Sequence, residues 1–180
     1  FSGISLAILN AEARTRLFKL LSSEKKAGKK IVFDNNYRPK LWKDKATTQA
    51  VFQEAFGVST TALITADDHQ NVFDLQNESD VISHSQNLGV NEVIIKRGAS
   101  PTLVRTENDP AWIEVPTDKV AKVVDTTAAG DSFAAGYLSR RLLGNTPAMS
   151  AAFGNQVAAK VVQHRGAIIP VDAMKDLMCS

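Results

Sequence analysis

Cysteine, tryptophan and tyrosine are scarce in this sequence, and neither sign of charge is in clear excess. The 180 residues include one cysteine, Cys179, and carry 21 Lys and Arg against 19 Asp and Glu, a formal net charge of +2. A single cysteine excludes an internal disulfide and indicates a reducing, cytoplasmic setting. The near balance of charge gives no support for nucleic-acid binding. No apolar run reaches the length of a membrane span, and no spacing of His and Cys suggests a metal site.

The overall composition is that of an ordinary soluble globular protein, with 44% hydrophobic and 22% charged residues. This length fits one domain, residues 1–180, with a sizeable core. The chain opens on FSGISLAIL, in which Phe1 reads as the end of a buried strand. We therefore expect the C-terminal part of a longer protein.

Helical patterns alternate with short strands rich in Val and Ile, which is typical of βαβ units and a parallel sheet. Asn10 and Asp44 are suitable N-caps for helices that reach about Ala27 and Phe56. The other expected helices span about 77–88, 131–143 and 147–163, with a short one near Asp172. The expected strands are 30–34, 61–65, 92–96, 102–105, 112–115 and 122–124.

Ligands of such sheets bind at the carboxyl ends of the strands. Three stretches follow predicted strands: 35–42, 66–68 and 125–131. We expect them to share one rim of the sheet.

The stretch DTTAAGD, 125–131, follows a predicted strand and opens a predicted helix. The backbone N–H groups of Ala128, Ala129, Gly130 and Asp131 can therefore converge at the positive end of the helix dipole. The pattern predicts a cradle for a phosphate. A carboxylate repels an anion, so Asp131 is interpreted as a general base; a plain helix-start acid is the alternative reading.

DTTAAGDSF resembles the DTxGAGDxF motif of ribokinase-like (PfkB) carbohydrate kinases, with Ala128 at a Gly position. The resemblance implies a three-layer α/β/α core with a mostly parallel sheet, whose N-terminal part and β-sheet lid this chain lacks. It makes Asp131 the catalytic base and Ala128, Ala129 and Gly130 the anion hole. Asp125 and Thr127 match residues that hold a monovalent cation such as K⁺ in several members.

Two further segments resemble the nucleotide site of that family. KRGASPTLV, 96–104, is similar to its KxGxxG turn, although Pro101 replaces the second Gly, and RGAIIP, 165–170, is similar to the segment that borders the adenine. The resemblance implies ATP-binding roles for the following residues: Lys96, Gly98, Gly130, Asn155, Gly166 and Ala167. An ordinary polar helix residue is the alternative for Asn155.

The NxxE motif that the family links to Mg²⁺ should lie near TADDHQ, 65–70, but Ala66 and His69 stand at its Asn and Glu positions. Asp67 and Asp68 could replace it through water, because Mg²⁺ prefers oxygen ligands and keeps several waters. We expect His69 to be a surface residue.

The loop DNNYRPKLW, 34–42, carries the indication of substrate. Arg38 can grip a carboxylate in a bidentate fork, while Tyr37 and Trp42 can wall a pocket. A surface Arg38 stacked on Trp42 is the alternative. The pattern D-x-N-x-R-x-x-L-W, with Asn36 inside it, resembles the loop of the family members that phosphorylate 2-keto-3-deoxygluconate, a sugar acid.

The sequence therefore predicts an ATP- and Mg²⁺-dependent kinase that converts 2-keto-3-deoxygluconate to its 6-phosphate. A kinase of a neutral sugar, fructose or ribose, is one alternative, and a nucleotide-binding fragment without activity is another. The expected partners are the sugar acid and ATP, with no nucleic acid and no membrane. Family members often pair through the lid, which favours a homo-oligomer.

Overall fold

The computed structural model describes residues 1–178, and Cys179, on which the expectation about disulfides depends, lies outside them. The chain divides into two compact units. The first comprises Phe1–Ile95 and Arg105–Ala111, and the second comprises Lys96–Val104 and the described part of Trp112–Ser180. Each unit is described by itself.

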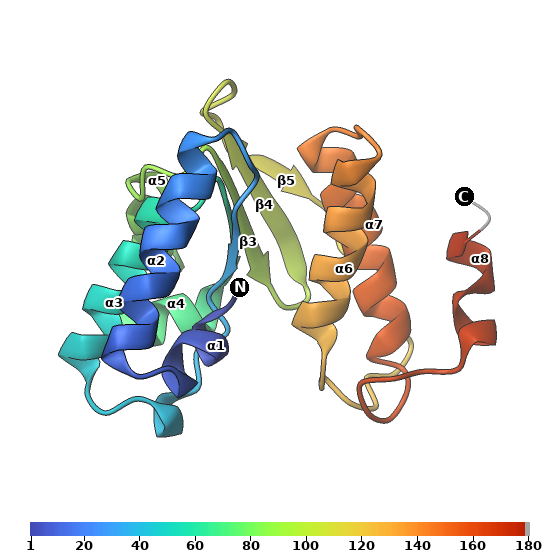
Figure 1. The fold of residues 1–180 in the computed structure, drawn as a ribbon. Coiled ribbons are helices and arrows are strands. Elements are labelled where there is room, and N and C mark those ends of the chain that lie inside the picture. Colours follow the sequence, from blue (N-terminus) through green and yellow to red (C-terminus); the bar gives the residue numbers. More distant parts are fainter. Residues whose placement is uncertain (179–180) are drawn as a thin grey trace. The chain divides into compact units, whose positions relative to one another are not determined.

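The described residues form helices and strands in alternation through the first half of the chain (Figure 1). In chain order they are α1 (Gly3–Ile8), α2 (Ala11–Lys26), β1 (Val32–Asp34), η1 (Pro39–Leu41), α3 (Lys45–Val58), β2 (Thr61–Thr65), α4 (Ala66–Phe73), α5 (Glu78–Gln86), β3 (Glu92–Arg97), β4 (Ser100–Thr106), β5 (Ile113–Val115), α6 (Ala129–Leu142), α7 (Pro147–Val161), η2 (Val171–Met174) and α8 (Lys175–Met178).

The five strands form one sheet in the order β1-β2-β3-β4-β5. Strands β1 and β2 are parallel, with Val32 opposite Thr61, whereas β4 and β5 are antiparallel. Ser2 adds a parallel bridge to Asp34, so the chain before α1 pairs with the far side of β1. The α/β class is confirmed, and the sheet is mixed.

The first unit packs α1 to α5 around an aromatic core. Phe33 of β1 meets Phe52 and Phe56 of α3 at ring-centroid distances of 5.4 and 5.0 Å, and all three side chains are buried. Edge-to-face contacts of this kind are favourable beyond the area that they bury. Asn10 and Asp44 accept N–H bonds in the first turns of α2 and α3, as predicted.

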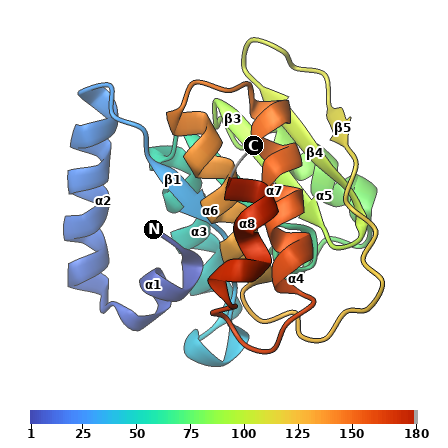
Figure 2. The ribbon, with the colours of Figure 1, turned by 90° about the vertical axis from the view of Figure 1, so that its right-hand side faces the viewer.

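The second unit is built on the helix pair α6 and α7, which run side by side in both ribbon views (Figure 1 and Figure 2). Glycines permit this close approach, because a Cβ at Gly136 would lie 3.0 Å from the Cα of Gly154. Phe133 of α6 fills the space beside Gly154, where an added Cβ would lie 3.0 Å from its ring. A side chain at either glycine would push the helices apart.

The structure corrects two expectations about local structure. Residues 122–124 form no strand: the N–H groups of Val124 and Asp125 both donate to the carbonyl of Val162, and Val124 is 44% exposed. His69 is fully buried instead of lying on the surface.

Two helices, α1 and α4, were not predicted from the sequence. Helix α4 follows β2 without a loop, and its first residues are polar. Its buried residues, Ala66, His69 and Val72, recur every three positions. The helical period was therefore hidden by a histidine on the buried face.

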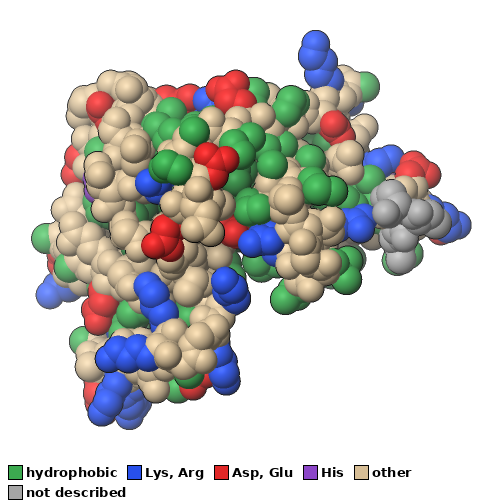
Figure 3. Space-filling view, turned by 90° about the horizontal axis from the view of Figure 1, so that it is seen from above, with side chains coloured by type: hydrophobic (Ala, Val, Ile, Leu, Met, Phe, Trp, Pro, Cys, Tyr) green, Lys and Arg blue, Asp and Glu red, His purple; other side chains and the backbone are tan. Residues whose placement is uncertain are grey.

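Lysines at the end of α2 have local partners. Lys25 donates to the carbonyls of Gly57 and Ser59 at the end of α3, and Lys29 pairs with Glu24. Figure 3 shows Lys and Arg side chains gathered at the lower left of the view from above. As for membranes, none of the helices within residues 1–178 has the length and hydropathy of a bilayer span.

Candidate active site

One candidate site, within the first unit, is the loop after β1, which is fastened to the end of β2 by a buried side chain. Asn35 is fully buried, and its carboxamide bonds both backbone groups of Thr65, donating to the oxygen at 3.0 Å and accepting from the nitrogen at 2.9 Å. Because β1 and β2 are parallel neighbours, both junctions lie at the carboxyl end of the sheet. The expectation that 35–42 and 66–68 meet at this rim is confirmed.

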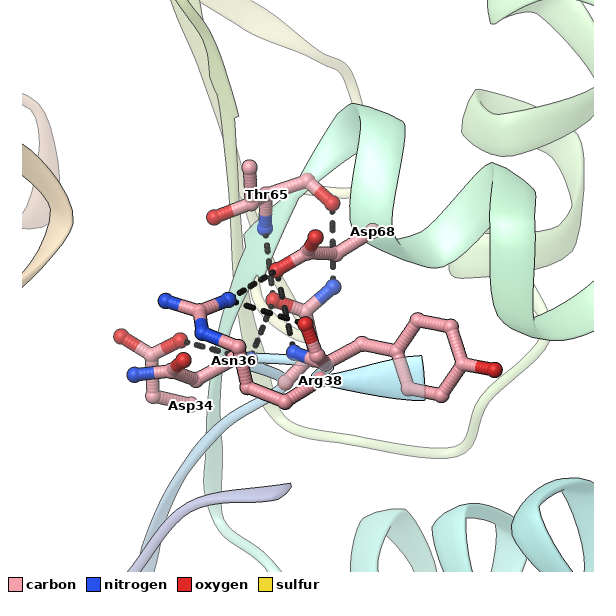
Figure 4. Close-up of polar contacts among 7 residues, drawn as sticks. Asp34, Asn36, Arg38, Thr65 and Asp68 are labelled. Atoms are coloured by element: carbon pink, nitrogen blue, oxygen red, sulfur yellow. Dashed lines mark hydrogen bonds and ion pairs between the residues drawn. The ribbon is translucent and has the colours of Figure 1, made fainter. Parts of the chain in front are cut away.

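Asp68, in the first turn of α4, holds the next residues of the loop (Figure 4). Its Oδ2 accepts the backbone N–H of Tyr37 at 3.0 Å and lies 3.9 Å from the Nη1 of Arg38. The same Nη1 donates to the carbonyl of Tyr37 at 2.9 Å. The Arg38 side chain remains 54% exposed, so most of its fork is open to a ligand.

Asn36 takes an unusual backbone conformation at the centre of this loop. Its φ is +24°, and its N–H donates to the Oδ1 of Asp34 at 3.2 Å and to that of Asn35 at 2.9 Å. Asparagine tolerates positive φ better than most residues. Its own Oδ1 is a buried acceptor that has no hydrogen-bond partner within the described residues.

The aromatic rings of the loop lie in the core and do not form a pocket wall beside Arg38. Tyr37 and Trp42 both pack edge-on against Phe52, at 6.2 and 5.6 Å between centroids. The cation over Trp42 is Arg14, at 5.9 Å, in place of the Arg38 stacking that was the alternative interpretation. Tyr37 thus contributes its backbone to the loop, while its ring anchors it.

A separate candidate site is the turn before α6, which belongs to the second unit. Ala128 has φ +59° and ψ +13°, the left-handed conformation that glycine adopts most easily. The N–H of Ala129 donates to the carbonyl of Thr126, and that of Ser132 to Ala128. Gly130 and Asp131 precede this first helical bond, so their N–H groups have no acceptor inside the helix and can point at an anion.

Lys96 approaches the same turn from β3. A Cβ added to Gly130 would lie 3.4 Å from the Lys96 Nζ, and Lys96 is only 9% exposed. An ammonium beside the positive end of a helix is unfavourable by itself, but the two together favour an anion. The carboxylate-bearing residue at this place, Asp131, is exposed.

Asp125 fastens the start of the turn to the RGAIIP segment. Its Oδ1 accepts the N–H of Thr127 at 2.8 Å and its Oδ2 that of Gly166 at 2.9 Å. The hydrogen bonds from Thr127 and then Gly166 lower the pKa of the Asp125 carboxyl to about 2. Both oxygens of this predicted cation ligand are thus engaged by backbone donors.

The remaining residues of the predicted nucleotide site fall into two settings. Gly98 and Gly166 have φ of +61° and +80°, which allow the β3–β4 turn and the bend before Ala167, itself exposed. Asn155 is buried, and its amide accepts from Thr102 and donates to the carbonyls of Val115 and Pro116. It ties α7 to β4 and β5.

A cavity of about 270 Å³ opens beside α7, one residue from Asn155. It is lined by Gln156, Ala159 and Lys160 of α7 and by Gln163 just after this helix, together with Asp118, Lys119, Val120 and Leu177. As for metals, the side chains of residues 1–178 do not bring three His, Cys, Asp or Glu together as an ion site would require.

Sequence reasoning missed Asn35 and the role of Asp68. Asn35 lies between Asp34 and Asn36, the two residues that belong to the D-x-N-x-R pattern. Its importance depends on its burial, which the identity of a single residue does not reveal. Asp68 was considered only as a substitute Mg²⁺ ligand. The signal that could have found both was their place after adjacent parallel strands.

These features define an α/β protein in which a turn of small residues opens helix α6 and leaves first-turn N–H groups without an acceptor inside the helix. The pattern of the pfkB family carbohydrate kinase matches residues 1–174, and the chain belongs to this family.

Curated relatives narrow the family. The chain is 46% identical over 175 residues to 2-dehydro-3-deoxygluconokinase of Escherichia coli K12 and 38% identical over 176 residues to that of Haemophilus influenzae. These alignments cover 96% and 98% of this chain but 56% of each relative, so the chain spans little more than half their length.

Solved structures show the same fold. Aminoimidazole riboside kinase from Salmonella enterica, complexed with aminoimidazole riboside and an ATP analog, has a TM-score of 0.84 and 25% identity; the alignment covers 98% of this chain and 61% of that chain. Fructokinase from Vibrio cholerae, with fructose, ADP and calcium ion bound, has a TM-score of 0.81 and 24% identity, with coverage of 93% and 55%. The ribokinase-like fold is confirmed.

Proposed function

We propose that the protein containing this chain transfers the γ-phosphate of ATP to the 6-hydroxyl of 2-keto-3-deoxygluconate. Identity of 46% to relatives named for that activity supports the substrate. Because the chain covers 56% of the length of those relatives, the proposal concerns the whole protein that contains this chain. The reaction produces a sugar-acid 6-phosphate and ADP.

The observation that carries the chemistry is the first turn of α6. In the proposed reaction the Asp131 carboxylate accepts the proton of the attacking hydroxyl, and the alkoxide displaces ADP from the γ-phosphorus. The N–H groups of Gly130 and Asp131, with Ala128 and Ala129 shaping the turn, receive the charge on the transferring group. The Lys96 ammonium, near Gly130, adds positive charge for phosphate.

Arg38 is assigned to the substrate carboxylate. Its half-exposed guanidinium presents a planar fork that matches a carboxylate, and a neutral sugar would not need it. The neighbouring Asn36 Oδ1, a buried acceptor, is assigned to a substrate hydroxyl.

For the nucleotide, we assign the base to the cavity beside α7. Gln156 and Gln163 supply amides there, which can bind the polar edge of a base. Gly98, Gly166 and Ala167 are outside the lining of this cavity, and their nucleotide-binding roles stay predictions. Asn155 acts in this assignment by holding the wall of the cavity through its three hydrogen bonds.

Among residues 1–178, no three His, Cys, Asp or Glu side chains gather where a metal ion could bind. Mg²⁺ would arrive with ATP and keep water and phosphate ligands, so no step is assigned to a protein-bound magnesium ion. A K⁺ site at Asp125 and Thr127 stays a prediction, since the carboxylate already accepts two N–H bonds. Homo-oligomerisation through a lid and a cytoplasmic location likewise stay predictions.

A neutral-sugar kinase is the second candidate, because a fructokinase of Vibrio alginolyticus is 26% identical over 180 residues. The test is ADP release with Mg·ATP and 2-keto-3-deoxygluconate, fructose or ribose as acceptor. A strong preference for the sugar acid is expected. Turnover of neutral sugars alone would contradict the substrate, and no turnover of any acceptor would contradict the proposed function.

A further inference from the structure

We infer that Asp68 is a positioning residue of the substrate site: it fixes the backbone of the 36–38 loop and thereby aims Arg38 at the acidic group of the substrate. The inference rests on the proposed function for its substrate. It departs from the expectation that Asp68 replaces a magnesium ligand.

The contacts of Asp68 place it in the loop. Its Oδ2 accepts the Tyr37 N–H at 3.0 Å and faces the Arg38 Nη1 at 3.9 Å. Of these two residues, Tyr37 has its ring packed on Phe52, whereas Arg38 has an exposed guanidinium. A single oxygen of Asp68 therefore contacts both the anchored residue Tyr37 and the exposed guanidinium of Arg38.

Charge argues against a metal role. A carboxylate that ligates Mg²⁺ lies in a cluster of oxygen ligands, whereas this one is flanked by an N–H donor and a guanidinium. The half-buried Asp68 side chain is 22% exposed, against 54% for Arg38, so the pair is partly shielded from water. The cost of losing an acceptor for a charged or backbone donor is greatest in such a place.

The neighbouring contacts make the loop responsive to this one bond. Asn35 already fixes the first loop residue to Thr65, and Asn36 is held at positive φ by Asp34 and Asn35. Beyond Tyr37, Pro39 starts the short helix η1. Asp68 thus holds the segment between two fixed points, where Arg38 lies.

The test compares Asp68→Ala, Asp68→Asn and the control Glu78→Ala in the whole protein that contains this chain. Glu78 is an exposed acid in the first turn of α5, so its variant matches the loss of a first-turn charge. Asp68→Ala should raise KM for the sugar acid about tenfold or more with kcat and KM for ATP within about twofold. Asp68→Asn keeps an oxygen that can accept the Tyr37 N–H, so it should stay within about threefold of wild type, as should Glu78→Ala.

Hydrogen exchange of residues 36–42 is the second measurement, and it needs no turnover. Asp68→Ala should speed exchange of this segment at least severalfold, and neither other variant should. If Asp68→Ala lowers kcat and changes the Mg²⁺ requirement, with Asp68→Asn equally impaired, the positioning role is overturned in favour of a metal role. If the wild type phosphorylates no sugar acid, the proposed function fails, and the exchange data alone decide: unchanged exchange in Asp68→Ala overturns the positioning role as well.

Discussion

Helices α4 and α6 each carry an aspartate at the third residue, in the same relation to the helix dipole, yet the two side chains are used differently. Asp68 of α4 is turned to a neighbouring loop and bonds its backbone. Asp131 of α6 is exposed, next to N–H groups with no intrahelical acceptor. The position within a helix is therefore the same, and only the surroundings differ.

The difference shows how a first-turn acid acquires its role. Where a parallel strand ends alongside, as β1 does beside β2 and α4, the carboxylate finds a loop to hold. Where the preceding turn is made of small residues, as at 128–130, the carboxylate lies beside backbone N–H groups that can bind an anion. In the proposed reaction the first arrangement would orient the substrate, and the second would suit proton transfer.

Of the substitutions considered, removal of the exposed Asp131 carboxylate should have the largest effect on activity. Asp131→Asn should lower kcat by about 10³- to 10⁴-fold, because the amide cannot accept the hydroxyl proton. KM for ATP and the thermal stability should change little. Steady-state kinetics, with Glu78→Gln in the first turn of α5 as the control for loss of a first-turn charge, checks this prediction. Activity of Asp131→Asn within a few fold of wild type would show that Asp131 is not the base.

The second prediction concerns Arg38, the side chain that Asp68 contacts, and its role in binding the substrate carboxylate. Arg38→Ala should raise KM for the sugar acid about 10- to 100-fold, the cost of losing a charge-assisted fork. Arg38→Lys should recover part of the loss, since it restores charge without the bidentate geometry. The KM values for neutral sugars serve as the internal control, and an equal rise for them would refute a carboxylate role.

A third prediction concerns how α4 is held from its buried side. His69, the residue after Asp68, is buried in α4, with its Nε2 2.9 Å from the Nδ1 of His84 and its ring against Phe73. Burial, and then the neighbouring His84, lower the pKa of His69 from 6.5 to about 3. The unfolded chain therefore takes up a proton that the folded chain refuses, and stability is lost as pH falls from about 6.5 towards 3.

The wild type should lose about 2 kcal/mol of unfolding free energy at this site between pH 8 and pH 5. His69→Phe, which keeps a ring in the cluster, should have a flatter pH dependence. Urea unfolding at pH 8, 6.5 and 5 measures both slopes. Equal slopes for the two proteins would mean that His69 does not carry the acid sensitivity.

Elements whose structure depends on local chemistry were predicted correctly from the sequence. The caps Asn10 and Asp44 and the strand 61–65 were predicted at the positions observed, because capping and β-propensity act over a few residues. The helix start after DTTAA was predicted within two residues.

The predictions were wrong or incomplete where contacts between residues distant in the chain determine the structure. Residues 122–124 have the composition of a strand, yet their N–H groups meet Val162, near the end of α7. His69 has a polar side chain, yet it is buried against Phe56 and His84. Such contacts join residues far apart in the chain, so no local pattern contains them. The same holds for Asp68, whose role depends on Tyr37.

The smallest expected effect is a change in the free energy of unfolding, and it depends on a difference between the turns before α4 and α6. The turn before α4 is held by side-chain bonds from Asn35, whereas the turn before α6 depends on Ala128 adopting φ +59°, which costs an L-residue about 1–2 kcal/mol. Ala128→Gly should relieve this cost, offset by the greater freedom of glycine in the unfolded chain, for a net gain of about 0.5–1 kcal/mol. Ala129→Gly, one residue later in the helix, should instead lose about 0.5–1 kcal/mol, because no strain is relieved there. Opposite shifts of the urea midpoint, with kcat of Ala128→Gly close to wild type, would show that the turn is strained yet keeps its N–H groups in place; shifts of the same sign would mean that Ala128 stores no strain.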